Sequence, residues 1–271
     1  MAIIMVAGIA AVSLAICRPS AKSEKYDIVF CGDSIIEGNI WAEPIPLMLG
    51  DAMGMKVLNA GFGGLTMAES AKEGYAGDFT YFYSMVTLSE LWKNNALDKL
   101  SLAISSEEYV MPHGWKERID ALSKLDISNV RLVLIEYGVN DYLSGNSVEN
   151  PEDAYDIRTF SGALRKAIEN IREGAPQVRI VIVTPTYMRT GFGECIEYDF
   201  GGGTLDEYVD KEIEIAREYG IPVVDNFHDG IINKDNLETV TSDNLHTNEE
   251  GNRLIVDNIL KRLKEIEGLT K

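Results

Sequence analysis

The sequence predicts an α/β protein in which a five-stranded parallel β-sheet lies between two layers of helices. Five short apolar runs have the length and composition of strands that are buried on both faces. The segments between them show helical periodicity, and strands that alternate with helices form parallel sheets. Short polar motifs follow the first three runs, at the carboxyl ends where ligand sites of such sheets lie.

The strand candidates come in chain order with turn-forming residues around them. The third run reads Leu-Val-Leu-Ile-Glu-Tyr and the fourth reads Val-Arg-Ile-Val-Ile-Val, both typical of a sheet interior. The predicted strands cover residues 27–31, 56–59, 131–137, 178–183 and 221–224.

Two helices carry start signals. We expect one from Asn150 to Glu173, because Asn150 can cap it and Pro151 suits its first turn. The last helix is expected to begin at Thr247, which forms a capping-box pattern with Glu250 three residues later.

The stretch at about residues 75–125 is long for a single connection between the second and third strands. It is rich in aromatic residues, so it is either a helical insertion with its own small core or a lid or wall over the substrate. Its aromatic residues are Tyr75, Phe79, Tyr81, Phe82, Tyr83, Trp92, Tyr109 and Trp115.

The chain is strongly acidic. It has 25 Lys and Arg against 43 Asp and Glu, for a formal charge of −18. Such a surface repels phosphate backbones and anionic headgroups, so nucleic acid is excluded as a partner class. The three cysteines, Cys17, Cys31 and Cys195, form no zinc-binding pattern. A Cys31–Cys195 disulfide is compatible with the sequence but not required by it.

The N-terminus is set apart by an apolar run at residues 2–16, followed by a polar linker from Arg18. The run has the length of a signal-peptide core and is short for a membrane span. Basic residues follow the run instead of preceding it, and Ile16 precedes Cys17 where a lipoprotein signal has a small residue. We expect residues 1–25 to be a signal-like or membrane-anchor segment with a linker. A buried first element of a cytoplasmic protein is the alternative. Residues 26–271 are expected to form one domain.

Two motifs follow the first two strands. The first, Gly32-Asp33-Ser34, places a serine just beyond a strand end, where a nucleophile can be exposed at the edge of the sheet. Gly-Asp-Ser alone also suits an ordinary turn. The second motif reads Asn-Ala-Gly-Phe-Gly-Gly over residues 59–64. Its glycines allow a backbone N–H to approach a bound oxygen closely. It matches neither a dinucleotide fingerprint nor a phosphate-binding P-loop.

The third motif is Gly-Val-Asn-Asp, and its Asn140 can donate two amide hydrogens to an oxyanion or simply close a turn. The fourth is Asp-Asn-Leu-His, in which Asp243 lies three residues before His246. That spacing lets the carboxylate bind Nδ1 and leave Nε2 to accept a proton. His113 and His228 are assigned no such frame, and His228 is interpreted as structural.

Together the four motifs resemble the blocks that define the SGNH/GDSL hydrolase family of lipases and acylhydrolases. The resemblance implies a flavodoxin-like three-layer fold and ester hydrolysis without metal or cofactor. It implies that Ser34 is the nucleophile, that His246 is base and then acid, and that Asp243 orients His246. The N–H groups of Ser34 and Gly64 and the amide of Asn140 would form the oxyanion hole, with Gly63 as the neighbouring alternative donor. The GxSxG elbow of α/β-hydrolases is absent.

Within that family the acidic surface and the export-like N-terminus favour an acetyl or other small acyl ester on a carbohydrate. A lipase, lysophospholipase or thioesterase of the same family is the alternative. A non-catalytic carbohydrate-binding protein on the same fold is a third reading, which the intact set of motif residues disfavours.

Overall fold

The computed structural model describes residues 25–38, 42–69, 84–100 and 112–266. The predicted N-terminal segment and six aromatic residues of the 75–125 stretch, Tyr75, Phe79, Tyr81, Phe82, Tyr83 and Tyr109, lie outside these ranges. No helix in the described ranges is long and apolar enough to cross a membrane.

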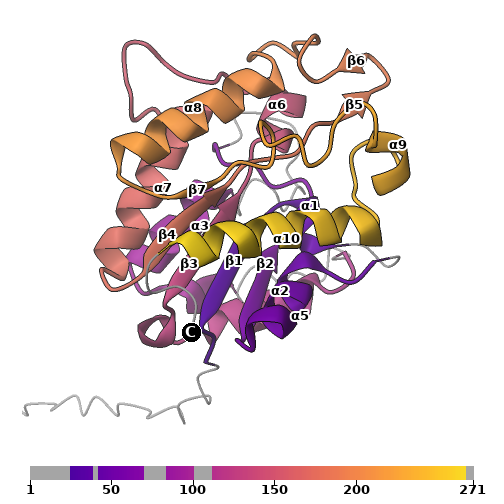
Figure 1. The fold of residues 1–271 in the computed structure, drawn as a ribbon. Coiled ribbons are helices and arrows are strands. Elements are labelled where there is room, and N and C mark those ends of the chain that lie inside the picture. Colours follow the sequence, from indigo (N-terminus) through magenta and orange to yellow (C-terminus); the bar gives the residue numbers. More distant parts are fainter. Residues whose placement is uncertain (1–24, 39–41, 70–83, 101–111, 267–271) are drawn as a thin grey trace, which may run out of the picture.

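A five-stranded parallel sheet forms the centre of the molecule, which confirms the predicted fold class (Figure 1). The strand order is β2-β1-β3-β4-β7, so β2 adds to one side of β1 and the later strands add in turn to its other side. The strands are β1 (Ile28–Gly32), β2 (Val57–Gly61), β3 (Leu132–Glu136), β4 (Arg179–Val183) and β7 (Val223–Val224). They match the five apolar runs, although the fifth strand is shorter than predicted.

The helices lie on both faces of the sheet. The larger ones are α2 (Ile45–Met53), α3 (Met85–Lys93), α5 (Trp115–Ser123), α7 (Phe160–Gly174), α8 (Leu205–Glu218) and α10 (Glu249–Glu265). The short ones are α1 (Ser34–Glu37), α6 (Val139–Ser144) and α9 (Leu237–Val240), with 3-10 turns at Leu97–Lys99 and Ile127–Asn129. A separate two-stranded hairpin pairs β5 (Arg189–Thr190) with β6 (Gly193–Glu194).

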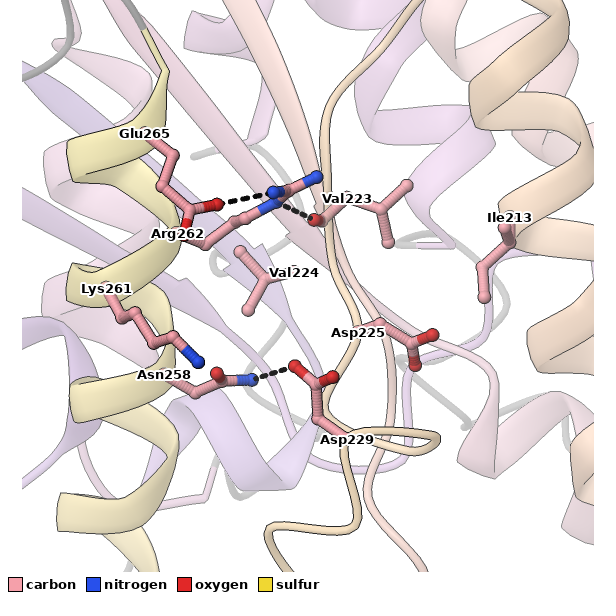
Figure 2. Close-up of a pocket in the computed structure, with 9 residues that line it drawn as sticks. All are labelled: Ile213, Val223, Val224, Asp225, Asp229, Asn258, Lys261, Arg262 and Glu265. Carbon is pink, nitrogen blue, oxygen red and sulfur yellow. Dashed lines mark hydrogen bonds and ion pairs between the residues drawn. The ribbon is translucent and has the colours of Figure 1, made fainter.

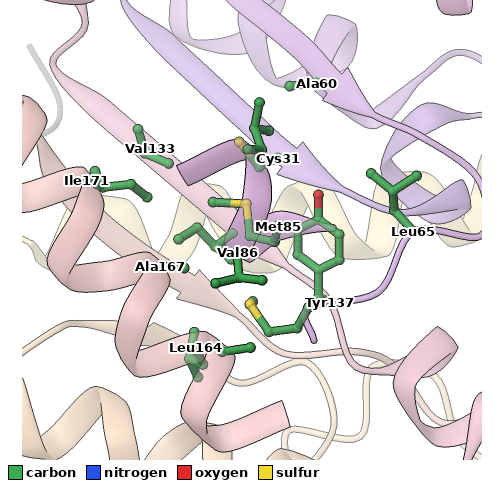
Figure 3. Close-up of a cluster of buried hydrophobic side chains, with 14 of the residues drawn as sticks. Cys31, Ala60, Leu65, Met85, Val86, Val133, Tyr137, Leu164, Ala167 and Ile171 are labelled. Carbon is green, nitrogen blue, oxygen red and sulfur yellow. The ribbon is translucent and has the colours of Figure 1, made fainter. Parts of the chain in front are cut away.

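Side chains of each central strand alternate between two cores, as the two-residue period of a strand requires. In β1, Val29 and Cys31 join the core under α3 and α7, whereas Ile28 and Phe30 join the core under α2 and α10. Figure 3 shows the first core, where strand residues such as Val133 face α7 and the start of α3. Thus the described helices of the 75–125 stretch are part of the layer that covers this face.

Two helix starts differ from the prediction. The helix expected at Asn150 begins at Phe160, with Thr159 as its cap. Asn150 instead closes a local turn, because its side chain accepts the N–H of Glu152. The last helix is capped by Asn248 and not by Thr247. Asparagine suits both helix caps and isolated turns, and only the following packing decides between them.

The two cysteines in the described ranges, Cys31 and Cys195, are buried free thiols. The disulfide that the sequence left open is therefore not formed between them.

Candidate active site

The register of the sheet brings three of the four motifs to one edge. Gly32, the last residue of β1, pairs with Gly61 of β2 and with Glu136 of β3. The loops that follow these three strands therefore start side by side at the carboxyl edge.

Ser34 is the first residue of α1, at the point where β1 ends. The carboxylate of Asp33 caps this short helix by accepting the N–H of Ile35 at 2.9 Å. The Ser34 hydroxyl is left facing the loop before α10, where His246 Nε2 lies 3.0 Å from its oxygen. The serine is thus held by backbone geometry while its Oγ contacts a base.

His246 is oriented by Asp243 through two contacts. The Asp243 carboxylate accepts the His246 backbone N–H at 2.7 Å with one oxygen, and its other oxygen lies 2.7 Å from Nδ1. Partial burial raises the pKa of Asp243, but hydrogen bonds from the His246 ring and backbone outweigh it and leave the pKa below its ordinary value. Asp243 is therefore ionised at neutral pH, and it favours the tautomer that leaves Nε2 able to accept the Ser34 proton.

Asn140 lies on α6, directly beyond β3. Its amide Nδ2 donates to the carbonyl oxygen of Leu65 at 3.0 Å and to Asp33 Oδ2 at 3.2 Å. Both partners are far away in the sequence, so these two hydrogen bonds are not those of a local turn. The amide points at the second motif, next to Gly64.

The glycine turn of the second motif offers one of the two candidate N–H donors. The N–H of Gly63 is already bound, because it donates to the carboxylate of Glu37 at 2.5 Å. Gly64 has a φ of +80°, a left-handed conformation that favours glycine. Neither the Gly64 N–H nor the Ser34 N–H has an acceptor within the described part of the chain. The N–H groups of Ser34 and Gly64 are therefore open to a further acceptor, whereas the Gly63 N–H and the two Asn140 amide hydrogens would each have to leave a present partner.

Sequence reasoning missed Asp141, which follows Asn140. Its buried carboxylate accepts the backbone N–H groups of Met67 and Ala68 at 2.7 and 3.0 Å, and so ties the segment just after the second motif to α6. Its place beyond a strand end, beside a candidate donor, was the one available signal. The bonds themselves join residues more than seventy positions apart.

A second Asp/His pair corrects the sequence analysis, which assigned His228 no carboxylate frame. Asp225 precedes His228 by three residues and binds its backbone N–H at 3.0 Å and its Nδ1 at 2.9 Å. The Asp-Asn-x-His pattern thus occurs twice. The two histidines differ in the partner of Nε2. In His228 this atom lies 3.6 Å from an Asp210 carboxylate oxygen, and in His246 it contacts the Ser34 hydroxyl.

A surface pocket of about 410 Å³ lies beside the edge strand β7, between α8 and α10 (Figure 2). It is lined by charged and polar side chains that include Asp225, Lys261 and Arg262, but by none of Ser34, Asp243 and His246. Within the described ranges no three His, Cys, Asp or Glu side chains are grouped so that they could hold a metal ion.

Two carboxyl groups beneath the site have raised pKa values. Burial raises the pKa of Asp33 from 3.8 to about 7 and that of Asp141 to about 6, against hydrogen bonds that lower both. The folded protein therefore binds these protons more tightly than the unfolded chain does. Their stabilising contribution is complete below the unfolded value and is lost as the pH rises through about 6 and 7.

We therefore expect the midpoint of thermal unfolding to be higher at about pH 5 than at about pH 8. A loss of the order of 2 kcal/mol in the free energy of unfolding would lower this midpoint by roughly 4–8 °C for a chain of this size. Calorimetry at both pH values measures this. The same pair of scans in about 1 M NaCl, where the Debye length is about 3 Å, screens the repulsion of the acidic surface. A pH difference that vanished in salt would assign the effect to surface charge instead.

Comparison with known proteins supplies the family. The model of the GDSL-like lipase/acylhydrolase family matches residues 30–254, which include all four motifs. The chain belongs to this family. As a GDSL-like acylhydrolase it is an esterase-type hydrolase. Among curated proteins none matches the chain significantly.

Several solved structures share the fold of this GDSL-like hydrolase. A protein from Lactobacillus plantarum is 17% identical with a TM-score of 0.62, covering 89% of this chain and 97% of its own. A possible lipase from Chitinophaga pinensis is 18% identical with a TM-score of 0.56, covering 88% and 97%. A salicylyl acyltransferase from a tetracycline biosynthetic pathway is 14% identical with a TM-score of 0.54, covering 90% of this chain and 56% of its own. At these identities the likeness concerns the fold.

Proposed function

We propose that this GDSL-like hydrolase cleaves a carboxylic ester through an acyl-enzyme on Ser34. The observation that carries the proposal is the unbroken contact chain from Asp243 through His246 to the Ser34 hydroxyl. Such a chain activates a serine that is otherwise a weak nucleophile.

In the first half-reaction, His246 Nε2 takes the hydroxyl proton as Ser34 Oγ attacks the ester carbonyl carbon. The carbonyl oxygen becomes an oxyanion, which accepts hydrogen bonds from the N–H groups of Ser34 and Gly64 and from the Asn140 amide. The alcohol leaves with the proton from His246, and the acyl group stays on Ser34.

In the second half-reaction, His246 takes a proton from water, and the resulting hydroxide attacks the acyl carbonyl. The second tetrahedral intermediate collapses to a free acid, and Ser34 regains its proton. Asp243 stays ionised throughout and stabilises the imidazolium that forms in each half.

A short acyl group is supported by the packing behind the glycine turn. The apolar space between this turn and the helices beside it is too small to hold a water molecule. A long acyl chain that took this route behind the glycine turn would have to open the packing. The lining side chains are Phe62, Leu65, Leu88, Leu100, Ile119 and Leu122.

A carbohydrate as the alcohol part is supported by an aromatic cluster formed by the tip of the β5–β6 hairpin and the loop that follows it. Phe192, at the hairpin tip, is 70% exposed and stacks on Tyr198 with ring centroids 5.4 Å apart. The hairpin is joined to the loop of Asp243 and His246, because the Arg189 N–H donates to the Asn244 carbonyl at 3.1 Å. Phe200 completes the cluster (Phe192, Tyr198 and Phe200) and packs against Tyr142 of α6. Exposed rings of this kind suit the apolar C–H face of a sugar.

The substrate class is tested with Phe192→Ala. We expect kcat/KM for a peracetylated monosaccharide to fall roughly 3–10-fold, the equivalent of about 0.5–1.5 kcal/mol of lost ring contact. Hydrolysis of ethyl acetate, whose alcohol is too small to reach the ring, should change less than about 2-fold. Tyr155→Ala, which removes another exposed ring on a different loop, is the matched control. Equal losses on both esters, or none on the sugar ester, would contradict a sugar subsite at Phe192.

The proposed location is extracytoplasmic. It rests on the apolar run at residues 2–16 and the acidic surface of the chain. Nucleic acid is not among the proposed partners, for the same reason of charge.

A further inference from the structure

Glu37 is a charged side chain in the site to which the proposed mechanism gives no role. It is the last residue of α1, three positions after Ser34, and so lies on the same side of that single turn. We propose that Glu37, held by Arg118, is a positioning residue that fixes the Gly63–Gly64 turn and so aims the Gly64 N–H at the oxyanion. This inference rests on the proposed serine mechanism.

The Glu37 carboxylate joins three elements. One oxygen accepts the Gly63 N–H at 2.5 Å. The other accepts the Trp115 indole N–H at 2.8 Å and forms an ion pair with the Arg118 guanidinium. The helix that carries the nucleophile, the glycine turn and α5 thus meet on one carboxylate.

The glycine turn is closed by one backbone hydrogen bond, from the Leu65 N–H to the Phe62 carbonyl at 3.2 Å, and the Glu37 contact adds a restraint on its first glycine. Two consecutive glycines have wide conformational freedom, and freezing them costs entropy. A Cβ on Gly63 would lie 2.8 Å from a Glu37 oxygen and 3.5 Å from the Ser34 Cβ, so the turn runs close against both side chains. Holding the N–H of Gly63 fixes the peptide unit before that residue and so restricts the next one, whose N–H belongs to Gly64.

Arg118 also touches the turn from a second direction. Its guanidinium lies 5.7 Å from the ring centre of Phe62, the residue before Gly63. That ring packs edge-to-face on Trp115 at 5.3 Å. Both members of the Glu37–Arg118 pair have side chains that are only 16% exposed, so their hydrogen bonds are shielded from water and salt. Burial lowers the pKa of the Arg118 guanidinium, and the neighbouring Glu37 carboxylate opposes that shift.

The test is Glu37→Gln, which keeps the size of the side chain and removes its charge. An amide cannot accept from Gly63, Trp115 and Arg118 as a carboxylate does. We expect kcat for a short-chain nitrophenyl ester to fall roughly 10-fold with KM within about 2-fold, because the Gly64 donor stays but is misaligned. The inhibition constant of ethylboronic acid, a probe that forms a tetrahedral adduct on serine, should rise by a similar factor. Glu43→Gln changes an exposed carboxylate nearby and should leave all three values unchanged.

Arg118→Met supplies the second arm, and it carries the test if Glu37→Gln does not fold. We expect the same loss of kcat with the same small change in KM. The double variant should be no worse than the more damaging single one, because both act through one carboxylate.

Different failures have different meanings. If Ser34→Ala kept the turnover of the wild type, the proposed function would be wrong, and this inference with it. A Ser34-dependent enzyme in which Glu37→Gln keeps full kcat would remove the inference alone. A Glu37→Gln protein that loses thermal stability but keeps its affinity for the boronic acid would assign Glu37 a purely structural role, which also overturns the inference.

Discussion

Ser34→Ala is expected to lower kcat on a short-chain nitrophenyl ester by about 10⁴–10⁶-fold, the range seen when a catalytic serine is removed. The reason is geometric as well as chemical. Oγ is the atom that lies 3.0 Å from His246 Nε2, and alanine leaves that base without a proton to take. The midpoint of thermal unfolding should change little, since Ser34 is only half-buried and alanine is well tolerated in a helix.

Covalent labelling gives a second readout of the same substitution. A fluorophosphonate should add its mass to the wild-type chain once and to Ser34→Ala not at all. Ser128→Ala, which changes an exposed serine in a 3-10 turn, should behave as wild type in both assays. Near wild-type turnover by Ser34→Ala would end the serine-nucleophile hypothesis.

The fold was predictable because the information that defines it is local. Each buried strand is a short apolar run, and such runs in alternation with helices have few ways to pack. Once the strands are parallel, their carboxyl ends share one edge, so the motifs with Ser34, Gly64 and Asn140 lie on the same edge. Their close approach also requires β1 to lie between β2 and β3, and the order of the motifs along the chain does not fix that strand order.

The parts that the sequence did not reveal depend on long-range contacts. Glu37 looks like an ordinary surface residue at the end of a turn until Trp115, 78 positions away, is seen to bind it. The two Asp-Asn-x-His segments are locally alike, and only the partner at Nε2 separates them, Ser34 for His246 and Asp210 for His228. The sequence pattern alone cannot show which of the two histidines contacts a serine, because the atom that binds Nε2 comes from a distant part of the chain.

Asn140→Ala is expected to lower kcat by roughly 10²–10³, the loss usual for one oxyanion donor, with little change in KM. In the structure the Asn140 amide points at the Gly64–Leu65 segment, 3.0 Å from the Leu65 oxygen and 3.2 Å from Asp33. An oxyanion that forms between Gly64 and Asn140 can take one of these amide hydrogens. The neutral ester carbonyl gains less from the same donor, so the loss appears in kcat.

Asn140→Asp distinguishes a hydrogen-bond donor at this position from a residue that only forms a turn. We expect it to lower kcat at least as much as Asn140→Ala does. An ionised carboxylate at this position cannot donate, repels the oxyanion and faces the carboxyl group of Asp33. If Asn140 only closed an Asx turn, aspartate would make the same turn and keep the activity. Asn150 is the matched control, because its side chain does close such a turn by accepting the Glu152 N–H, so Asn150→Asp should stay active. Steady-state kinetics of the three variants decide the matter: an Asn140→Asp enzyme as active as Asn150→Asp would remove Asn140 from the proposed oxyanion hole.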